Sequence, residues 1–415
     1  MKEKILKLID SYEDIAIELE TGLCKIPAIS PDSDGYGEID KCEFLESWLK
    51  AKGFGALERF DAPDERAKGK VRPNLIASIN GADKTKPCFW IMSHIDIVPP
   101  GELSLWKNDP YKAYVYSGED GKKRISGRGV EDNQQGLVSS VLAAIALKQL
   151  GITPPRPVKL LFVSDEENGS LFGVDWLIKN HPKLFSPNDC ALVPDSGEKS
   201  GCSIEVAEKN IIWARFVTKG LQVHGSRPDL GKNAHLAGAE LALRLHEGLT
   251  KKFSDKDNLF DLEYSTFEPT KKEANVPNIN TIPGEDIFCM DMRFLPRYPV
   301  ATVLAEIDRI ISEVKTKYGV TIEYSTPQSM ESKPTSPDAP LIKALSENIE
   351  TVYGVKGKPV GIGGGTVAAY LRNVGIDAAV WCRITHTAHQ PNECALLENI
   401  LGDAKVMALM MLRES

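Results

Sequence analysis

Apolar and polar positions alternate with two different periods along this chain of 415 residues. Residues 2–24, 42–52 and 137–150 place apolar side chains at helical spacing, and Gly151 follows the last of these segments. Short apolar runs between them, such as PNLIASIN and PCFWIMSHIDIV, predict strands. Helices that alternate with buried strands predict an α/β fold with a mostly parallel sheet flanked by helices.

The pattern changes near residue 208 and returns to alternation after the loop SMESKPTSPDAP. The elements expected between these points are strands at 209–220 and 320–327, helices at 234–253 and 300–319, and a strand–turn–strand at 278–296. This order predicts a compact α+β unit of antiparallel strands and two helices. We expect residues 208–324 to be inserted into one catalytic domain that consists of residues 1–207 and 325–415.

Four apolar, strand-like runs each end at side chains that bind metals or transfer protons. The four ends are His94-Ile95-Asp96, Asp165-Glu166-Glu167, Asp195-Ser196-Gly197 and His386-Thr387-Ala388-His389. In an open α/β sheet, ligands bind outside the carboxyl ends of the strands, so these residues should meet. Buried carboxylates repel one another unless a cation compensates them, and added histidines favour zinc-like metals. The sequence therefore predicts a metal centre.

A fifth segment, SGRGVEDNQQG, places Asp132 just before the helix at 137–150. By itself this aspartate is best interpreted as a helix cap. With Asp132 included, however, the potential ligands outnumber those of one catalytic zinc, which takes about three. The five are His94, Asp132, Glu167, Asp195 and His389. They suit two metals about 3.5–4 Å apart with one carboxylate between them, and Glu166 is then free to act as general base.

Composition excludes several other classes. A formal net charge of -8 argues against nucleic acid or an anionic membrane as the main partner. The first thirty residues contain no continuous apolar stretch, so we expect neither a signal peptide nor a membrane span, and we place the protein in the cytoplasm. The eight cysteines are scattered singly, as is typical of reduced structural residues.

The ordered motifs HIDIVPPG, GRGVEDNQQG, SDEENGS, VPDSG, HGSRPDLGKNA, GGGT and THTAHQPNE resemble a di-zinc metallopeptidase family. That family includes carnosinase-like dipeptidases, carboxypeptidase G, acetylornithine deacetylase and succinyl-diaminopimelate desuccinylase. The resemblance extends over nearly the whole chain, from about residue 85 to about residue 400. It implies two zinc ions, with cobalt or manganese as possible substitutes.

The resemblance also assigns roles to single residues. It implies that His94 and Asp195 hold one zinc, that Glu167 and His389 hold the other, and that Asp132 bridges them. Glu166 would be the general base, and Asp96 would orient His94. The inserted unit would be a lid and dimerisation domain of a homodimer, in which His224 helps to polarise the scissile carbonyl. The expected substrate contacts are Arg293, Asn280, Gly364, Gly365 and Thr366.

Several positions have more than one interpretation. Arg293 either binds a substrate carboxylate or pairs with Asp291 or Glu285 on the same sheet face. Asp165 is expected to be a solvated or loop-capping carboxylate. Of the two terminal histidines, His389 precedes Gln-Pro-Asn-Glu as the family pattern requires, so we assign it as the ligand and His386 as a supporting residue. Gln134-Gln135 replaces a Lys-Gly pair of many relatives, which leaves the substrate subfamily open.

The function that these residues predict is zinc-dependent hydrolysis of an amide bond in a small substrate with a free carboxylate. That substrate is a dipeptide or an N-acyl amino acid: GGGT is similar to the dipeptidase branch, and HGSRPDLGKNA is similar to the deacylase branch. Two alternatives are a catalytically silent, metal-bound binding or scaffold protein and a di-metal phosphoesterase. The phosphoesterase needs cationic groups near the metals, and only Arg128 lies within the metal motifs.

Overall fold

The computed structural model describes residues 1–414, which divide into two compact units. The first unit comprises Met1–Val206, Thr335–Pro359 and residues 366–414, and the second comprises Ala207–Pro334 and Val360–Gly365. The second unit thus continues past residue 324, where we expected the insertion to end. The reason is that strand β14 (Thr321–Met330) extends the sheet of that unit.

The first unit contains an eight-stranded sheet of order β1-β2-β6-β3-β7-β16-β8-β15. Its four central strands are parallel and comprise β6 (Val158–Val163), β3 (Phe89–His94), β7 (Cys190–Gly197) and β16 (Asp377–Cys382). The outer strands are β1 (Leu57–Pro63), β2 (Val71–Ile79), β8 (Ser203–Glu208) and β15 (Lys358–Ile362). The predicted α/β fold with a mostly parallel sheet is confirmed.

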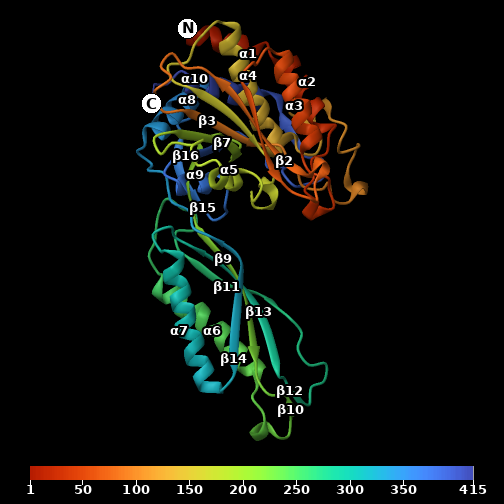
Figure 1. Cartoon of the computed structure of the whole chain (residues 1–415), viewed down its shortest axis with the longest axis vertical. Coiled ribbons are helices and arrows are strands. Elements are labelled where there is room, and N and C mark those ends of the chain that lie inside the picture. The colour runs from red at the N-terminus through yellow and green to blue at the C-terminus, as the bar shows by residue number, and fades with distance from the viewer. Residues whose placement is uncertain (415) are drawn as a thin grey trace. The chain divides into compact units, whose positions relative to one another are not determined.

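Helices cover both faces of this sheet, as Figure 1 shows. The almost wholly buried α4 (Gln135–Gln149) packs on β3, β6 and β7, and α10 (Leu397–Met411) packs on α4. On the opposite face of the sheet, α5 (Val174–Asn180) and α9 (Ala368–Asn373) pack on the strands and form one apolar cluster with them. The remaining helices are α1 (Lys2–Asp10), α2 (Glu13–Cys24), α3 (Ile39–Ala51) and α8 (Pro340–Tyr353).

The segment 2–24, which has one helical pattern, forms two helices. The break lies at Ser11 and Tyr12, where the Ser11 hydroxyl donates to the backbone oxygen of Leu8 and so satisfies a carbonyl at the end of α1. Hydroxyl groups that bond to nearby backbone in this way favour helix ends over helix interiors.

A small sheet of order β17-β5-β4 determines where two loops of the first unit meet. It consists of β17 (Cys394–Leu396), β5 (Lys123–Ser126) and β4 (Tyr114–Ser117). Its register places Ser126 opposite Cys394. The segment that follows Ser126 and the segment that precedes Cys394 are therefore neighbours, although they are far apart in sequence.

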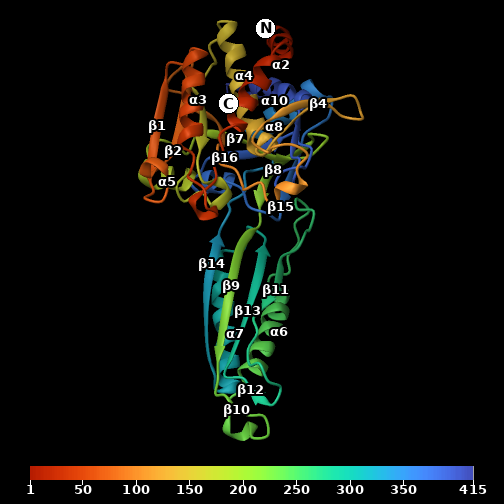
Figure 2. The same ribbon diagram turned by 90° about the vertical axis from the view of Figure 1, so that its right-hand side faces the viewer.

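The second unit contains the predicted antiparallel strands and two helices. Figure 2 shows its four strands side by side in the order β11 (Thr266–Lys272), β13 (Glu285–Phe294), β9 (Asn210–Lys219) and β14. Alternate residues of β13 are buried, and they pack against α6 (Ala234–Lys252) and α7 (Val300–Tyr318). A short antiparallel ladder pairs β10 (Val223–His224) with β12 (Thr281–Ile282).

Two further sequence expectations concern cysteines and membranes. All eight cysteines are free thiols, and six of them are buried, as expected for reduced structural residues.

Among the helices of residues 1–414, none combines the length and the apolar character that a membrane crossing requires.

Candidate metal centre

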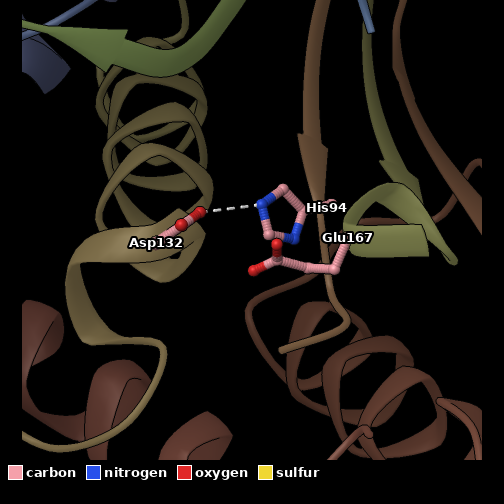
Figure 3. A group of neighbouring side chains, drawn as sticks. All are labelled: His94, Asp132 and Glu167. Carbon is pink, nitrogen blue, oxygen red and sulfur yellow. Dashed lines mark hydrogen bonds and ion pairs between the residues drawn. The ribbon is translucent and has the colours of Figure 1, made fainter. Parts of the chain in front are cut away.

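The five predicted ligands come from five segments that converge at one end of the parallel sheet. His94 is the last residue of β3, and Asp195 lies near the end of β7. Asp132 lies in the turn Val130–Gln134 before α4, and Glu167 lies in the short turn Glu166–Asn168 after β6. Figure 3 shows the side chains of His94, Asp132 and Glu167 pointing toward one another. His389 follows β16 in a turn.

Asp132 lies between the two histidines. Its Oδ1 is 3.0 Å from Nε2 of His94, and its Oδ2 is 3.0 Å from Nε2 of His389. A second carboxylate contacts the same Nε2 atom of each histidine. Asp195 Oδ1 is 3.3 Å from His94 Nε2, and Glu167 Oε1 is 3.1 Å from His389 Nε2. The five side chains therefore form two overlapping acid–imidazole groups that share Asp132.

The electrostatics of the cluster show a deficit of positive charge. Burial opposes a charge on His94, yet Asp195 and Asp132 raise its pKa well above the ordinary value. Hydrogen bonds to Asp132 and Glu167 raise the pKa of His389 to about 10. Burial, followed by the charge of Asp195, raises the pKa of Glu166 well above its usual range. In these groups bound protons supply the positive charge that the carboxylates lack. Divalent metal ions bound by the same nitrogen and oxygen donors would supply that charge instead, so they would fit the cluster.

Glu166 belongs to the same cluster. One carboxylate oxygen of Glu166, one nitrogen of His94 and one carboxylate oxygen of Asp195 all lie within 4.8 Å of one another. A second group, His94, Asp132 and Glu167, meets the same condition. Glu166 is therefore close enough to the predicted ligands to exchange a proton with a small molecule held among them.

Asp96 connects His94 to the turn that contains both glutamates. His94 Nδ1 lies 3.1 Å from the backbone oxygen of Asp96 and 3.4 Å from its carboxylate. The two carboxylate oxygens of Asp96 accept the backbone N–H groups of Glu166 at 3.1 Å and Glu167 at 3.0 Å. A partner on the second ring nitrogen fixes the orientation of a ligand histidine. These contacts support the orienting role expected of Asp96.

Asp165 differs from its sequence expectation in one respect. Its carboxylate accepts the backbone N–H of Phe172 at 3.1 Å, so the loop-capping interpretation is confirmed. The solvated interpretation is wrong, because Asp165 is buried and lies 3.2 Å from Nη2 of the buried Arg72 on β2. The turn of Glu166 and Glu167 thus begins at a carboxylate that a buried arginine holds.

His386 does not join the cluster. Its side chain is exposed and makes no hydrogen bond or ion pair within residues 1–414. Asn133, which the sequence did not single out, instead donates to Oδ1 of Asp195 at 2.7 Å and to the backbone oxygen of Pro194 at 2.7 Å. No contact therefore supports the role that we expected of His386, whereas Asn133 contacts the predicted ligand Asp195.

His224 and Asn280 lie together in the second unit. Register places His224 opposite Thr281, and the backbone N–H of Gly225 donates to the backbone oxygen of Asn280 at 2.6 Å. Nδ1 of His224 accepts the backbone N–H of Ser226 at 3.1 Å. Nδ1 therefore offers a lone pair, and in the neutral ring the proton is on Nε2. His224 is thus an exposed hydrogen-bond donor through Nε2.

Arg293 pairs with Asp291, which was one of its two sequence interpretations. Nε and Nη2 donate to the Asp291 carboxylate at 2.7 Å and 3.0 Å, and Nη1 donates to the backbone oxygen of Gly363 at 3.0 Å. These three bonds leave two of the five guanidinium N–H groups for a further acceptor. Gly364 is partly exposed and Gly365 is exposed, and the Thr366 hydroxyl accepts the backbone N–H of Ala368 at 3.2 Å.

A mostly parallel α/β sheet with an acid–imidazole cluster at the ends of its strands defines a candidate metallohydrolase. Residues 90–413 match peptidase family M20/M25/M40, which is most of the chain. The chain therefore belongs to this family, and it is a metallohydrolase.

Individual relatives cover the chain almost end to end. An uncharacterised metallohydrolase of Methanocaldococcus jannaschii is 38% identical over 410 residues, which is 94% of this chain and 97% of the relative. A succinyl-diaminopimelate desuccinylase of Methylobacterium nodulans is 27% identical over 398 residues, which is 92% of each chain. The crystal structure of aminopeptidase PepT from Bacillus cereus superposes with a TM-score of 0.77 at 17% identity and covers 96% of this chain and 98% of its own. The last similarity shows the fold.

Proposed function

We propose that this protein hydrolyses the amide bond of a dipeptide or an N-acyl amino acid. The proposed reaction uses two divalent metal ions bound by the protein, and zinc is the expected metal. The observation that supports this most directly is the position of Asp132, whose two carboxylate oxygens each contact a different histidine. A carboxylate between two ligand groups suits the bridge of a two-metal site.

The remaining ligands divide into two sets around Asp132. His94 and Asp195 would hold one ion, and Glu167 and His389 would hold the other, because each pair is already in contact. Bound divalent ions polarise a carbonyl and lower the pKa of water. Asp96 and Asn133 would keep His94 and Asp195 in place through the contacts described above.

Glu166 is the proposed general base. It lies beside His94 and Asp195 but is not needed to complete either ligand set. Burial, followed by the charge of Asp195, raises the pKa of Glu166, which makes its carboxylate a stronger base toward the proton that it must accept. In the proposed reaction Glu166 takes a proton from the attacking water and donates a proton to the departing amine.

The second unit is proposed to be the lid and dimerisation domain of a homodimer. His224 would donate its Nε2–H to the developing oxyanion of the scissile carbonyl. It can do so only where the second unit of the same chain, or of a partner, covers the centre. Arg293 would use its two remaining N–H groups for the substrate carboxylate, with Asn280, Gly364, Gly365 and Thr366 as further contacts.

One similar protein is named a desuccinylase and another an aminopeptidase, and these names agree with the two reaction types of the proposal, deacylation and peptide hydrolysis. The contacts of Arg128 count against the phosphoesterase alternative. Its guanidinium is buried, donates to Glu393 at 2.6 Å and stacks 5.2 Å from the Trp106 ring, so it does not offer its charge to a phosphate.

Amine release from a panel of dipeptides and N-acyl amino acids, with and without zinc, tests the proposal. We expect zinc-dependent release from at least one class, and release that is about 10²–10⁴-fold slower from the Glu166→Gln variant. A protein that binds zinc but hydrolyses no member of the panel would favour the scaffold alternative. Phosphate release from a parallel panel of phosphoesters would favour the phosphoesterase.

A further inference from the structure

Each of two loops at the candidate metal centre contains a buried glutamate that binds the backbone of the other loop. One loop, residues 127–132, follows β5 and contains the bridging candidate Asp132. The other, residues 385–393, precedes β17 and contains His389. Because Ser126 lies opposite Cys394, the two loops begin to diverge at the same point of the small sheet. Each loop then places one glutamate into the other, and neither glutamate has a role in the proposed function.

Glu131 binds the loop that contains His389. Its carboxylate accepts three backbone N–H groups, those of Thr385, Thr387 and Ala388, the last at 2.9 Å. The Thr387 hydroxyl lies 2.8 Å from the same carboxylate. Only 4% of Glu131 is exposed, so water cannot replace these donors without loosening the loop.

Glu393 binds the loop that contains Asp132. Oε1 accepts the backbone N–H groups of Glu131 at 2.9 Å and Asp132 at 3.0 Å. Oε2 accepts the backbone N–H of Gly129 at 3.0 Å and Nη1 of Arg128 at 2.6 Å. Glu393 is fully buried. The two glutamates therefore form a reciprocal clamp, in which each carboxylate satisfies three backbone donors of the opposite loop.

We infer that Glu131 and Glu393 are positioning residues that hold Asp132 and His389 at the separation which two metal ions require. Asp132 follows Glu131 directly, and its backbone N–H is bound by Glu393. His389 follows the three amides that Glu131 binds. Movement of either loop would change the contact of 3.0 Å between Asp132 and His389. This inference rests on the proposed metal centre.

Glutamine variants at the two positions test the clamp. In Glu131→Gln or Glu393→Gln, an amide NH₂ replaces an oxygen, and in either orientation it faces a backbone donor. Loss of such supporting contacts typically weakens metal binding about 10–100-fold. We expect this decrease in zinc affinity, measured by competition with a chelating dye, in both variants. Because the clamp is one unit, the double variant should lose less than the product of the two single effects.

Amide hydrogen exchange supplies a readout that does not depend on activity. Each single variant should speed the exchange of the amides at 385–389 and at 127–132, since each loop is held by the other. Thr387→Val, which replaces one hydroxyl by a methyl group and leaves both glutamates in place, is the milder second variant if a glutamine variant does not fold. It should weaken zinc binding in the same direction but by less.

Asp189→Asn is the matched control. The Asp189 carboxylate is buried and accepts the backbone N–H of Cys88 at 2.8 Å and Nε1 of Trp90 at 2.9 Å, so asparagine also places a donor against a donor. It lies at the amino ends of β3 and β7, opposite to the ligand ends. This variant should lose stability and keep the wild-type zinc affinity.

The outcomes separate the clamp from the proposed function. Weaker zinc binding in both glutamine variants, with normal binding in Asp189→Asn, supports the clamp. A wild-type protein that binds zinc while both glutamine variants bind it as Asp189→Asn does would overturn the clamp and leave the metal centre intact. A wild-type protein that binds no zinc would overturn the proposed function, and the clamp's role with it.

Discussion

Replacement of Arg72 by methionine should destabilise the first unit strongly. Arg72 is fully buried, and its guanidinium binds the carboxylate of Glu38 through Nε at 2.6 Å and through Nη2. Nη2 also lies 3.2 Å from Asp165, and Nη1 lies 3.5 Å from Asp64. Removal of one partner from a buried ion pair costs about 3–5 kcal/mol, because the other charge is left without compensation. Here Glu38 and Asp165 both lose their partner, so we expect a loss in that range or above it.

The loss should depend on pH. Burial raises the pKa of Glu38 to about 7 although Arg72 opposes this, and without Arg72 the pKa should rise further. A carboxyl group whose pKa is higher in the folded state favours folding at acid pH, and this contribution is lost as the pH rises through the folded value. The deficit of Arg72→Met should therefore be smaller at about pH 5 than at about pH 8.

Urea unfolding, followed by amide hydrogen exchange in β2 and β6, measures this deficit for the first unit. Arg59→Met is the control, because Arg59 forms only partly exposed ion pairs with Asp61 and Glu43, and such pairs contribute about 0–1 kcal/mol. Arg72→Met combined with Glu38→Gln should recover part of the loss. Equal stability of Arg72→Met and Arg59→Met would refute the reasoning.

Three further predictions concern other residues. Glu166→Gln should keep the metal content and lower turnover by about 10²–10⁴-fold, whereas Glu167→Gln should lower the metal content. Elemental analysis and kinetics distinguish the two variants. Equal metal loss in both would contradict the assignment of Glu166 as base and Glu167 as ligand. His224→Ala should lower kcat by about 10²–10³-fold with unchanged metal content. Mixing it with Glu166→Gln subunits should restore activity if the contact comes from a partner. A monomeric enzyme whose His224→Ala variant has normal turnover would contradict both the carbonyl contact of His224 and the dimer. Burial raises the pKa of Asp403 from 3.8 to about 7, so its contribution to folding is present at acid pH and is lost as the pH rises toward 7. Asp403→Asn should flatten this part of the urea stability profile, and an unchanged profile would argue against it.

The sequence predicted that these acidic and histidine side chains meet, because strand ends are visible as apolar runs that stop at polar residues. Parallel strands bring these ends to one edge of the sheet, and His94 and Asp195 accordingly meet there. The same rule explains why Glu167 contacts His389 although 222 positions separate them. The alternation of two periods likewise predicted the fold of both units.

The supporting contacts could not be predicted in this way. Glu131 and Glu393 act through backbone amides of distant loops, and no periodicity reveals which amides a carboxylate will meet. The only sequence signal for Glu131 was its place between the glycine-rich run SGRGV and Asp132. The solvated alternative for Asp165 was wrong because its partner Arg72 lies on β2, 93 positions earlier, where the sequence gives no sign of the contact. The short strands β4, β5 and β17 contain too few residues for a clear pattern.

Metal content measured together with hydrolysis tests the central claim most directly. Elemental analysis should find more than one metal ion per chain, exhaustive chelation should abolish amide hydrolysis, and zinc, cobalt or manganese should restore it. Full activity in a metal-free preparation would contradict the account.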